Sequence, residues 1–128
     1  MKTVFEHATQ PPSWLKAFFE EIDSKRFGDG FDRLFLPDTQ LQFGVQRLTS
    51  FKEIKAHLQE FDSVMNTHHL VHEFWGSKTV NIFRGEIRFS PISGGEEKVS
   101  QIVHVLHMDG DQPSKIRCWY GAAGPGIA

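Results

Sequence analysis

The sequence predicts an α+β fold, in which three helices pack on one face of a strongly curved, mostly antiparallel sheet. Three observations support this. Apolar residues recur at helical spacing in the first half of the chain, they alternate with polar residues from position 68 onward, and Gly94-Gly95 and Asp109-Gly110 punctuate the alternating part as turns. Helices followed by a run of strands joined by short turns are typical of α+β proteins. A sheet that curves around its helices is expected to leave a conical cavity at its open end.

Two helices are expected before the first long strand. The first begins with Ser13 as N-cap and fades near Lys25, and its apolar face consists of Leu15, Phe18, Phe19 and Ile22. The second begins with Asp29 as its cap and is stopped by Pro37. The alternation in residues 39–45 then predicts a strand.

The third helix has the clearest start signal. Ser50 followed three residues later by Glu53 forms a capping box, and an apolar stripe follows it to about Met65. The side chains expected to be buried in the three helices are Leu15, Phe18, Ile22, Phe35, Ile54, Leu58 and Phe61. The remaining strands are expected over residues 68–75, 79–90, 99–108 and 115–120. In the second of these strands, Phe83, Ile87 and Phe89 alternate with charged residues and are expected to face inward. We expect a single domain over residues 1–128, with loose termini at residues 1–12 and 121–128.

Composition narrows the classes of function. Fourteen basic and sixteen acidic residues give a formal charge of -2, without the basic stripe expected of a nucleic-acid-binding protein. No segment reaches the ~20 apolar residues of a membrane span, and the N-terminus has no apolar run typical of a secretory signal. The single Cys118 favours a reducing compartment, so we expect a cytoplasmic protein. Twelve Phe, three Trp and only one Tyr predict a lipophilic interior or pocket.

Three short motifs resemble a known superfamily. They are the Phe-Glu-Glu-Ile-Asp-Ser-Lys segment at residues 19–25, Thr67-His68 with Trp75 seven residues further on, and the late hairpin around residues 104–116. Together with the element order, they resemble the NTF2-like superfamily and, within it, the SnoaL-like and scytalone-dehydratase-like small-molecule enzymes. The resemblance covers nearly the whole chain. It implies a cavity lined by Asp23 and His68, and chemistry without a cofactor.

The chain departs from these enzymes at several catalytic positions. The carboxylate base of ketosteroid-isomerase-like members is matched by a position near Phe43, which cannot accept a proton. The paired tyrosines of scytalone dehydratase are matched by Ile22 and Phe43. The residues that remain from the pattern are Asp23 and His68.

These two residues make a chemically reasonable pair. An imidazole in water titrates near pH ~6.5, so it can accept a proton at neutral pH, and a carboxylate bonded to one ring nitrogen fixes the tautomer. We therefore predict His68 as general base and Asp23 as its orienting partner. A solvated Asp23 at the end of the first helix, and a His68 that only packs at the helix-to-strand junction, are the structural alternatives.

Five further residues are candidates for substrate binding: Phe19, Phe43, His72, His104 and Trp119. Alternation places His72 on the strand face of His68, with His69 and Glu73 turned the other way. Four strand residues span roughly 13 Å, which is too far for His68 and His72 to share one metal ion, so no metal site is expected. In the strand that contains His104, neither face is clearly more apolar than the other, so the alternation does not show whether His104 faces the cavity.

The best functional prediction is a cofactor-free lyase, cyclase or isomerase. Its substrate would be a lipophilic oxygenated metabolite, and the resemblance implies a compound derived from a polyketide or terpenoid. The alternative is a non-catalytic ligand-binding or dimerisation module of the same fold. One strand carries apolar residues on both of its faces, such as Ile102 and Val103. One small domain cannot bury both faces of a strand, so we also predict a homodimer.

Overall fold

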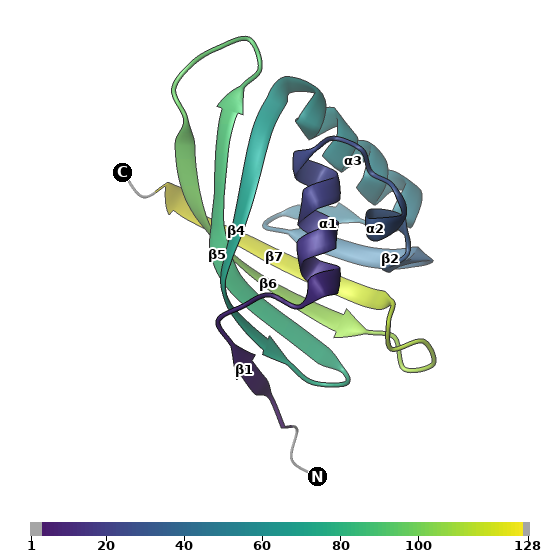
Figure 1. The fold of residues 1–128 in the computed structure, drawn as a ribbon. Helices are drawn as coiled ribbons and strands as arrows, with labels where there is room; N and C mark the ends of the chain where they lie inside the picture. The colour runs from purple at the N-terminus through teal and green to yellow at the C-terminus, as the bar shows by residue number, and fades with distance from the viewer. Residues whose placement is uncertain (1–3, 127–128) are drawn as a thin grey trace.

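In the computed structural model, which describes residues 4–126, a curved seven-stranded sheet is covered by helices on its concave side (Figure 1). The strands lie in the order β1-β4-β5-β6-β7-β2-β3, and only the β2–β7 pair is parallel. The helices are α1 (Ser13–Asp23), α2 (Asp29–Asp32) and α3 (Phe51–Val64). The strands are β1 (Glu6–Ala8), β2 (Phe35–Phe43), β3 (Gln46–Leu48), β4 (Met65–Gly76), β5 (Val80–Pro91), β6 (Lys98–Met108) and β7 (Ile116–Gly126). The predicted α+β cone is confirmed.

Both long helices form where the sequence predicts them. Half of the capping box of α3 is present, since the Ser50 hydroxyl accepts a hydrogen bond from the backbone N–H of Glu53 at 3.1 Å. The Glu53 carboxylate accepts from the N–H of Thr49, one residue before the expected partner. In α1, Pro12 occupies the cap position in place of the expected Ser13, and no side chain caps the helix. The apolar face of α1 is buried as expected, and it comprises Leu15, Phe18, Phe19 and Ile22.

The second helix is shorter than predicted. It ends at Asp32, and Phe35, expected in the helix, opens strand β2 opposite Ile116 of β7. Pro37 lies within a register shift of this strand pair, where the ladder is interrupted and a missing N–H costs little. Thr39 bridges the irregularity, because its hydroxyl accepts from the N–H of Leu36 and donates to the carbonyl of Ile116.

Both chain ends are more ordered than expected. Glu6–Ala8 pairs with the far end of β4, and β7 runs on to Gly126 alongside β6. The rest of the predicted loose termini, residues 1–3 and 127–128, lies outside the described residues. The expectation of loose segments over residues 1–12 and 121–128 is therefore wrong for these two strands.

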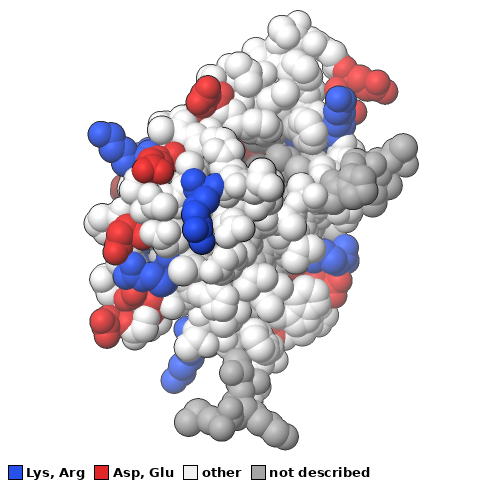
Figure 2. Space-filling view, turned by 180° about the vertical axis from the view of Figure 1, so that it is seen from behind, with Lys and Arg blue, Asp and Glu red and all other residues white. Residues whose placement is uncertain are grey.

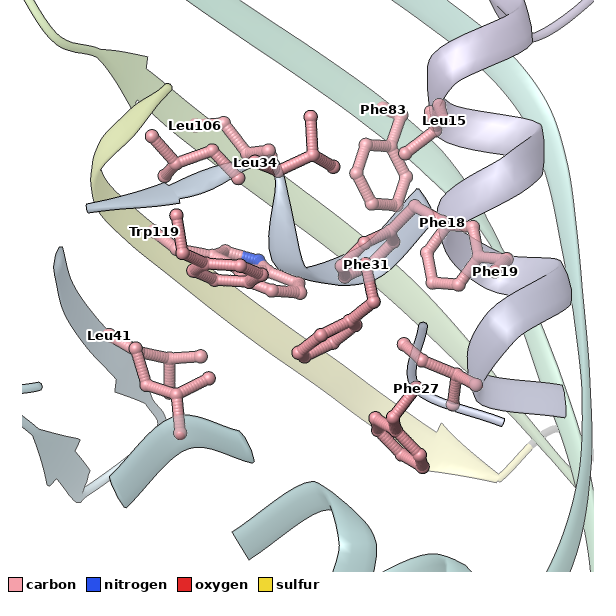
Figure 3. Close-up of a cluster of buried hydrophobic side chains, with 14 of the residues drawn as sticks. Leu15, Phe18, Phe19, Phe27, Phe31, Leu34, Leu41, Phe83, Leu106 and Trp119 are labelled. Atoms are coloured by element: carbon pink, nitrogen blue, oxygen red, sulfur yellow. The ribbon is translucent and has the colours of Figure 1, made fainter. Parts of the chain in front are cut away.

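An aromatic core fills the space between α1, α2 and the sheet (Figure 3). Phe18 lies parallel to Phe31 with ring centroids 5.2 Å apart, and it meets Trp119 edge-on at 5.3 Å. Burying each such side chain stabilises the fold by ~1.5–3 kcal/mol. Among the residues expected to be buried, Leu58 is only partly buried and Phe61 remains 37% exposed. Both of them line a cavity, which explains the difference.

The outer surface carries both signs of charge. Figure 2 shows Lys and Arg intermixed with Asp and Glu on the side turned away in Figure 1. On β5, Phe83, Ile87 and Phe89 face inward as predicted, while Arg84 pairs with Glu73 of β4. Within residues 4–126, no helix combines the length and the apolar character needed to cross a bilayer.

Candidate active site

A cavity of about 370 Å³ opens between α3, the end of α1 and the concave face of the sheet. This volume lies in the range of small-molecule sites. Most of its wall is apolar or aromatic, and the side chains include Phe19, Phe43, Phe61, Phe89, Ile102 and Trp119. The predicted lipophilic cavity is therefore present, with Phe19, Phe43 and Trp119 on its wall.

A carboxylate–imidazole pair lies beside the cavity, and its imidazole, His69, forms part of the wall. Asp23, the last residue of α1, meets His69 of β4, with Oδ1 2.6 Å from Nδ1. The same carboxylate accepts hydrogen bonds from the hydroxyl of Thr67 at 2.8 Å and from the backbone N–H of His69 at 2.9 Å. Burial by itself raises the pKa of Asp23, but its contacts with His69 and Thr67 outweigh burial and hold the pKa below its usual value.

The ionised Asp23 determines which nitrogen of His69 carries the proton. A carboxylate only accepts hydrogen bonds, so Nδ1 of His69 is the donor and Nε2 of the neutral ring has a free lone pair. The ring is held flat against Phe19, with centroids 4.4 Å apart and 16° between the planes. Among the described residues, no group bonds to Nε2 of His69. The pair therefore presents one oriented proton acceptor.

This arrangement corrects the predicted pairing. Asp23 meets His69, and not His68, which is exposed and absent from the cavity wall. Thr67 and His69 lie opposite Phe89 and Ile87 of β5, which face inward, so the odd-numbered residues at this end of β4 face the cavity. Because side chains alternate along a strand, an error of one position moves the whole set to the other face.

His72 is likewise on the outside. Its Nε2 lies 2.8 Å from the carboxylate of Glu86, and it takes no part in the cavity wall. His68 and His72 do lie on the same face of β4, as predicted, but that face is the outer one and not the cavity side. The register of β4 against β5 also shifts between Val71 and Glu73, next to this residue.

His104 of β6, whose face the sequence left undecided, points inward and is buried. Its Nδ1 accepts a hydrogen bond from the indole Nε1–H of Trp119 at 2.6 Å, and its ring stacks on Phe83 with centroids 4.9 Å apart. Burial, helped by the nearby His69, lowers the pKa of His104 to about 3. His104 is therefore neutral near pH 7, and because an indole N–H can only donate, the ring proton is on Nε2.

Besides His69, sequence reasoning missed Asp62, which lies in the last turn of α3 and lines the cavity. Only 3% of its surface is exposed, and neither carboxylate oxygen has a hydrogen-bond partner among the described residues. Burial raises the pKa of Asp62. A signal was available, because Asp62 stands four residues after Leu58 on the inward side of the helix, where a charged residue is unusual.

The part of the chain between residues 4 and 126 contains no convergence of three His, Cys, Asp or Glu side chains of the kind that holds a metal ion. The cavity wall carries polar groups of kinds that take part in acid–base chemistry and hydrogen bonding. They include one oriented acceptor on His69, one neutral donor on His104 and the carboxyl group of Asp62.

Comparison with known proteins identifies the fold. No family model matches the sequence, and no curated protein matches it. Among solved structures, an LEH-like epoxide hydrolase from M. tuberculosis is 13% identical with a TM-score of 0.72, over 87% of this chain and 80% of that one. An NTF2-like protein of unknown function from Burkholderia pseudomallei is 12% identical with a TM-score of 0.73, over 87% and 88%. TerC, co-crystallized with polyporic acid, is 14% identical with a TM-score of 0.71, over 87% and 88%.

Proposed function

The chain has the NTF2-like fold, and from that premise we propose that it is a cofactor-free enzyme that removes a proton from a lipophilic, oxygenated small molecule. The observation that carries the proposal is the Asp23–His69 pair, whose free Nε2 belongs to a ring on the wall of an apolar cavity. The LEH-like hydrolase and TerC, which have the same fold, support a small molecule as the ligand. Within this class, we propose a lyase, cyclase or isomerase acting on a polyketide- or terpenoid-derived ketone.

The first chemical step is proton transfer to His69. Its Nε2 takes a proton from the carbon next to the carbonyl group, and the electrons of the broken C–H bond move into an enolate. Asp23 keeps its hydrogen bond to Nδ1–H and stabilises the imidazolium that forms. His104 supplies a neutral N–H donor on the same cavity wall, suited to an oxygen that becomes negative.

The fate of the enolate determines the product. In an unsaturated ketone, return of the proton from His69 to the far carbon of the dienolate migrates the C=C bond. A β-hydroxyl group leaves as water by taking the proton from His69, which dehydrates the substrate. Attack of the enolate carbon on a second carbonyl closes a ring, and the new alkoxide takes the proton from His69. The apolar wall favours all three, because excluding water strengthens the hydrogen bonds to the reacting oxygen.

The test uses 2-tetralone, a bicyclic ketone with acidic protons next to its carbonyl group. In D₂O, the protein should accelerate exchange of these protons for deuterium, as followed by proton NMR. His69→Ala should lower the protein-catalysed exchange by 10²–10⁴-fold, the usual contribution of a general base. The matched control is His68→Ala, which changes the exposed neighbour and should leave the exchange rate unaltered.

Two results would contradict the proposal. One is catalysed exchange that survives in His69→Ala. The other is tight binding of 2-tetralone by the wild-type protein with no exchange above the buffer rate, which would favour the non-catalytic binding module.

We also propose that the chain forms a homodimer through the outer face of its sheet. Val103 on β6 and Tyr120 on β7 are 45% and 46% exposed there, and Val103 lies between Arg84 and Ala122 in the strand ladder. Light scattering should give about twice the chain mass of 14.6 kDa. Val103→Lys should shift the mass toward that of one chain, whereas a wild-type protein that is monomeric at micromolar concentration would contradict the proposal.

A further inference from the structure

Asp62 is the most unusual polar group in the molecule. It lies in the last turn of α3, lines the cavity and is 3% exposed, yet neither of its oxygens is hydrogen-bonded within residues 4–126. Buried polar side chains in native proteins are nearly always bonded, and each exception calls for an explanation. A group that lacks a partner in the free protein and lines a ligand-sized cavity is well placed to bind the ligand.

The surroundings of Asp62 determine its charge. The carboxylate of Asp23 on α1 disfavours ionisation, whereas Lys25, just after α1, and His69 on β4 favour it. His57 lines the same cavity from α3. The hydroxyl of Thr67 also lies near this carboxyl group and favours its ionised form, but its proton is donated to Asp23. Burial outweighs the effects of Lys25, His69 and Thr67, so the pKa of Asp62 is raised.

Lys25 does not form an ion pair with this carboxylate. Its ammonium group donates instead to the backbone carbonyls of Asp62 and Met65, at the C-terminal end of α3. Those carbonyls have lost their helical partners, so Lys25 caps the helix and is already occupied. The Asp62 carboxyl group keeps no strong bond to a cation that would hold it in the ionised form.

We propose that Asp62 acts as a carboxylic acid that donates a hydrogen bond to an oxygen of the bound ligand. The ligand class is thereby a neutral carbonyl compound, such as a ketone, ester or quinone, and not an amine cation. The catalytic part of this inference rests on the proposed function, because the same hydrogen bond would stabilise the enolate that forms when His69 removes a proton. The binding it predicts can be measured without any turnover.

Two probes with the same skeleton separate the protonation states. A protonated Asp62 favours 2-tetralone, whose ketone oxygen accepts a hydrogen bond. An ionised Asp62 favours 2-aminotetralin, which carries a positive charge at neutral pH. Calorimetric titration of the wild-type protein at pH 4.5 should therefore show tighter binding of the ketone than of the amine.

Two variants separate a hydrogen bond from simple packing. Asp62→Asn keeps an N–H donor at this position and should hold affinity for 2-tetralone within about threefold. Asp62→Leu keeps the branched shape of the side chain but lacks a donor, and should weaken binding about tenfold, the ratio that corresponds to one hydrogen bond. Wild-type affinity should also fall as the pH rises and Asp62 ionises, whereas affinity of Asp62→Asn should lack that decline.

Carbon-13 NMR of the Asp62 carboxyl group reports its ionisation directly, with or without a ligand. A carboxyl group whose pKa is no higher than that of an exposed aspartate, preferential binding of 2-aminotetralin, or an Asp62→Leu variant that binds 2-tetralone as tightly as wild type would each overturn the inference. Loss of affinity in Asp62→Asn equal to that in Asp62→Leu would do the same. The deuterium-exchange test of His69 is read separately, so either proposal can fail while the other stands.

Discussion

The indole Nε1–H of Trp119 donates a hydrogen bond to Nδ1 of His104 over 2.6 Å, across the β6–β7 pair. This contact leaves the ring proton of His104 on Nε2. His69 has the opposite tautomer, because its Nδ1 donates to the ionised Asp23. Two of the imidazoles that line the cavity therefore have complementary roles, because His104 presents a donor and His69 an acceptor.

The two tautomers can be observed directly. Two-bond ¹H–¹⁵N correlation spectra of histidine-labelled protein at pH 7.5 should show His104 protonated at Nε2 and His69 protonated at Nδ1. Asp23→Asn removes the charge that fixes His69 and should shift its signals toward the tautomer mixture of a free imidazole, while those of His104 keep their pattern. Finding His69 protonated at Nε2 in the wild-type protein would be incompatible with its role as the base.

Replacing His104 should make the protein less sensitive to acid. The pKa of His104 is about 3 in the folded chain, against about 6.5 in the unfolded chain, so below pH 6.5 only the unfolded chain takes up a proton at this residue. The free energy of unfolding therefore falls between pH 6.5 and 3, by at most ~1.4 kcal/mol per pH unit. His104→Gln retains an acceptor for Trp119 and should lose roughly 1–3 kcal/mol less than wild type between pH 6.5 and 4.5.

Urea unfolding at the two pH values measures this difference. The matched control is His68→Gln, since His68 is exposed and its replacement should leave the acid sensitivity as in wild type. Equal losses in wild type and His104→Gln would show that His104 is protonated in the folded chain.

Gly85 should not tolerate a side chain. A Cβ at this position would lie 1.9 Å from the carbonyl oxygen of Leu70 on the neighbouring strand, so β4 and β5 would have to separate. Gly85→Ala should destabilise the protein by ~2 kcal/mol or more, in the range of overpacked core positions. Gly110→Ala is the control, because a Cβ there meets no atom within 4 Å. Thermal melts that place both variants within 2 °C of each other would contradict the close approach.

Asp62 should reduce stability. Because the pKa of this carboxyl group is raised in the folded chain, the energetic penalty is absent below its ordinary pKa and grows as the pH rises through the folded-state value. Asp62→Leu should therefore increase the free energy of unfolding by ~1–3 kcal/mol at pH 8, and by less at pH 4.5. Chemical denaturation at both pH values provides the measurement, and a gain that is larger at the lower pH would reverse the assigned direction.

The sequence by itself determined the elements whose signals are local. The capping box at Ser50 and Glu53 and the apolar stripe behind it define α3, because helical hydrogen bonds join residues only four apart. The alternation of Phe83, Ile87 and Phe89 with charged neighbours likewise established which side of β5 is buried. These patterns, with the order of the elements, were sufficient for the fold class and for an aromatic cavity.

Strands that depend on a distant partner were decided by the tertiary structure. Phe35 extends because Ile116, 81 positions later, pairs with it, and the short Glu6–Ala8 strand exists because β4 offers a free edge. Neither partner can be read from the residues around these segments. For the same reason, the second helix was predicted too long and the chain ends too loose.

Two features of the site arise only in the tertiary structure: the register of β4 against β5, and the lack of a hydrogen-bond partner for the Asp62 carboxyl group among the described residues. The sequence places three histidines within five positions, and only the alignment of β4 against β5 turns His69 toward Asp23 and His68 toward the surface. The position of Asp62 on the inward side of α3 is visible in the sequence, but only packing removes water from its carboxyl group and leaves both oxygens unbonded among the described residues. Residue types are encoded locally, whereas the direction of a side chain and the solvation of a charge arise from contacts between segments far apart in the chain.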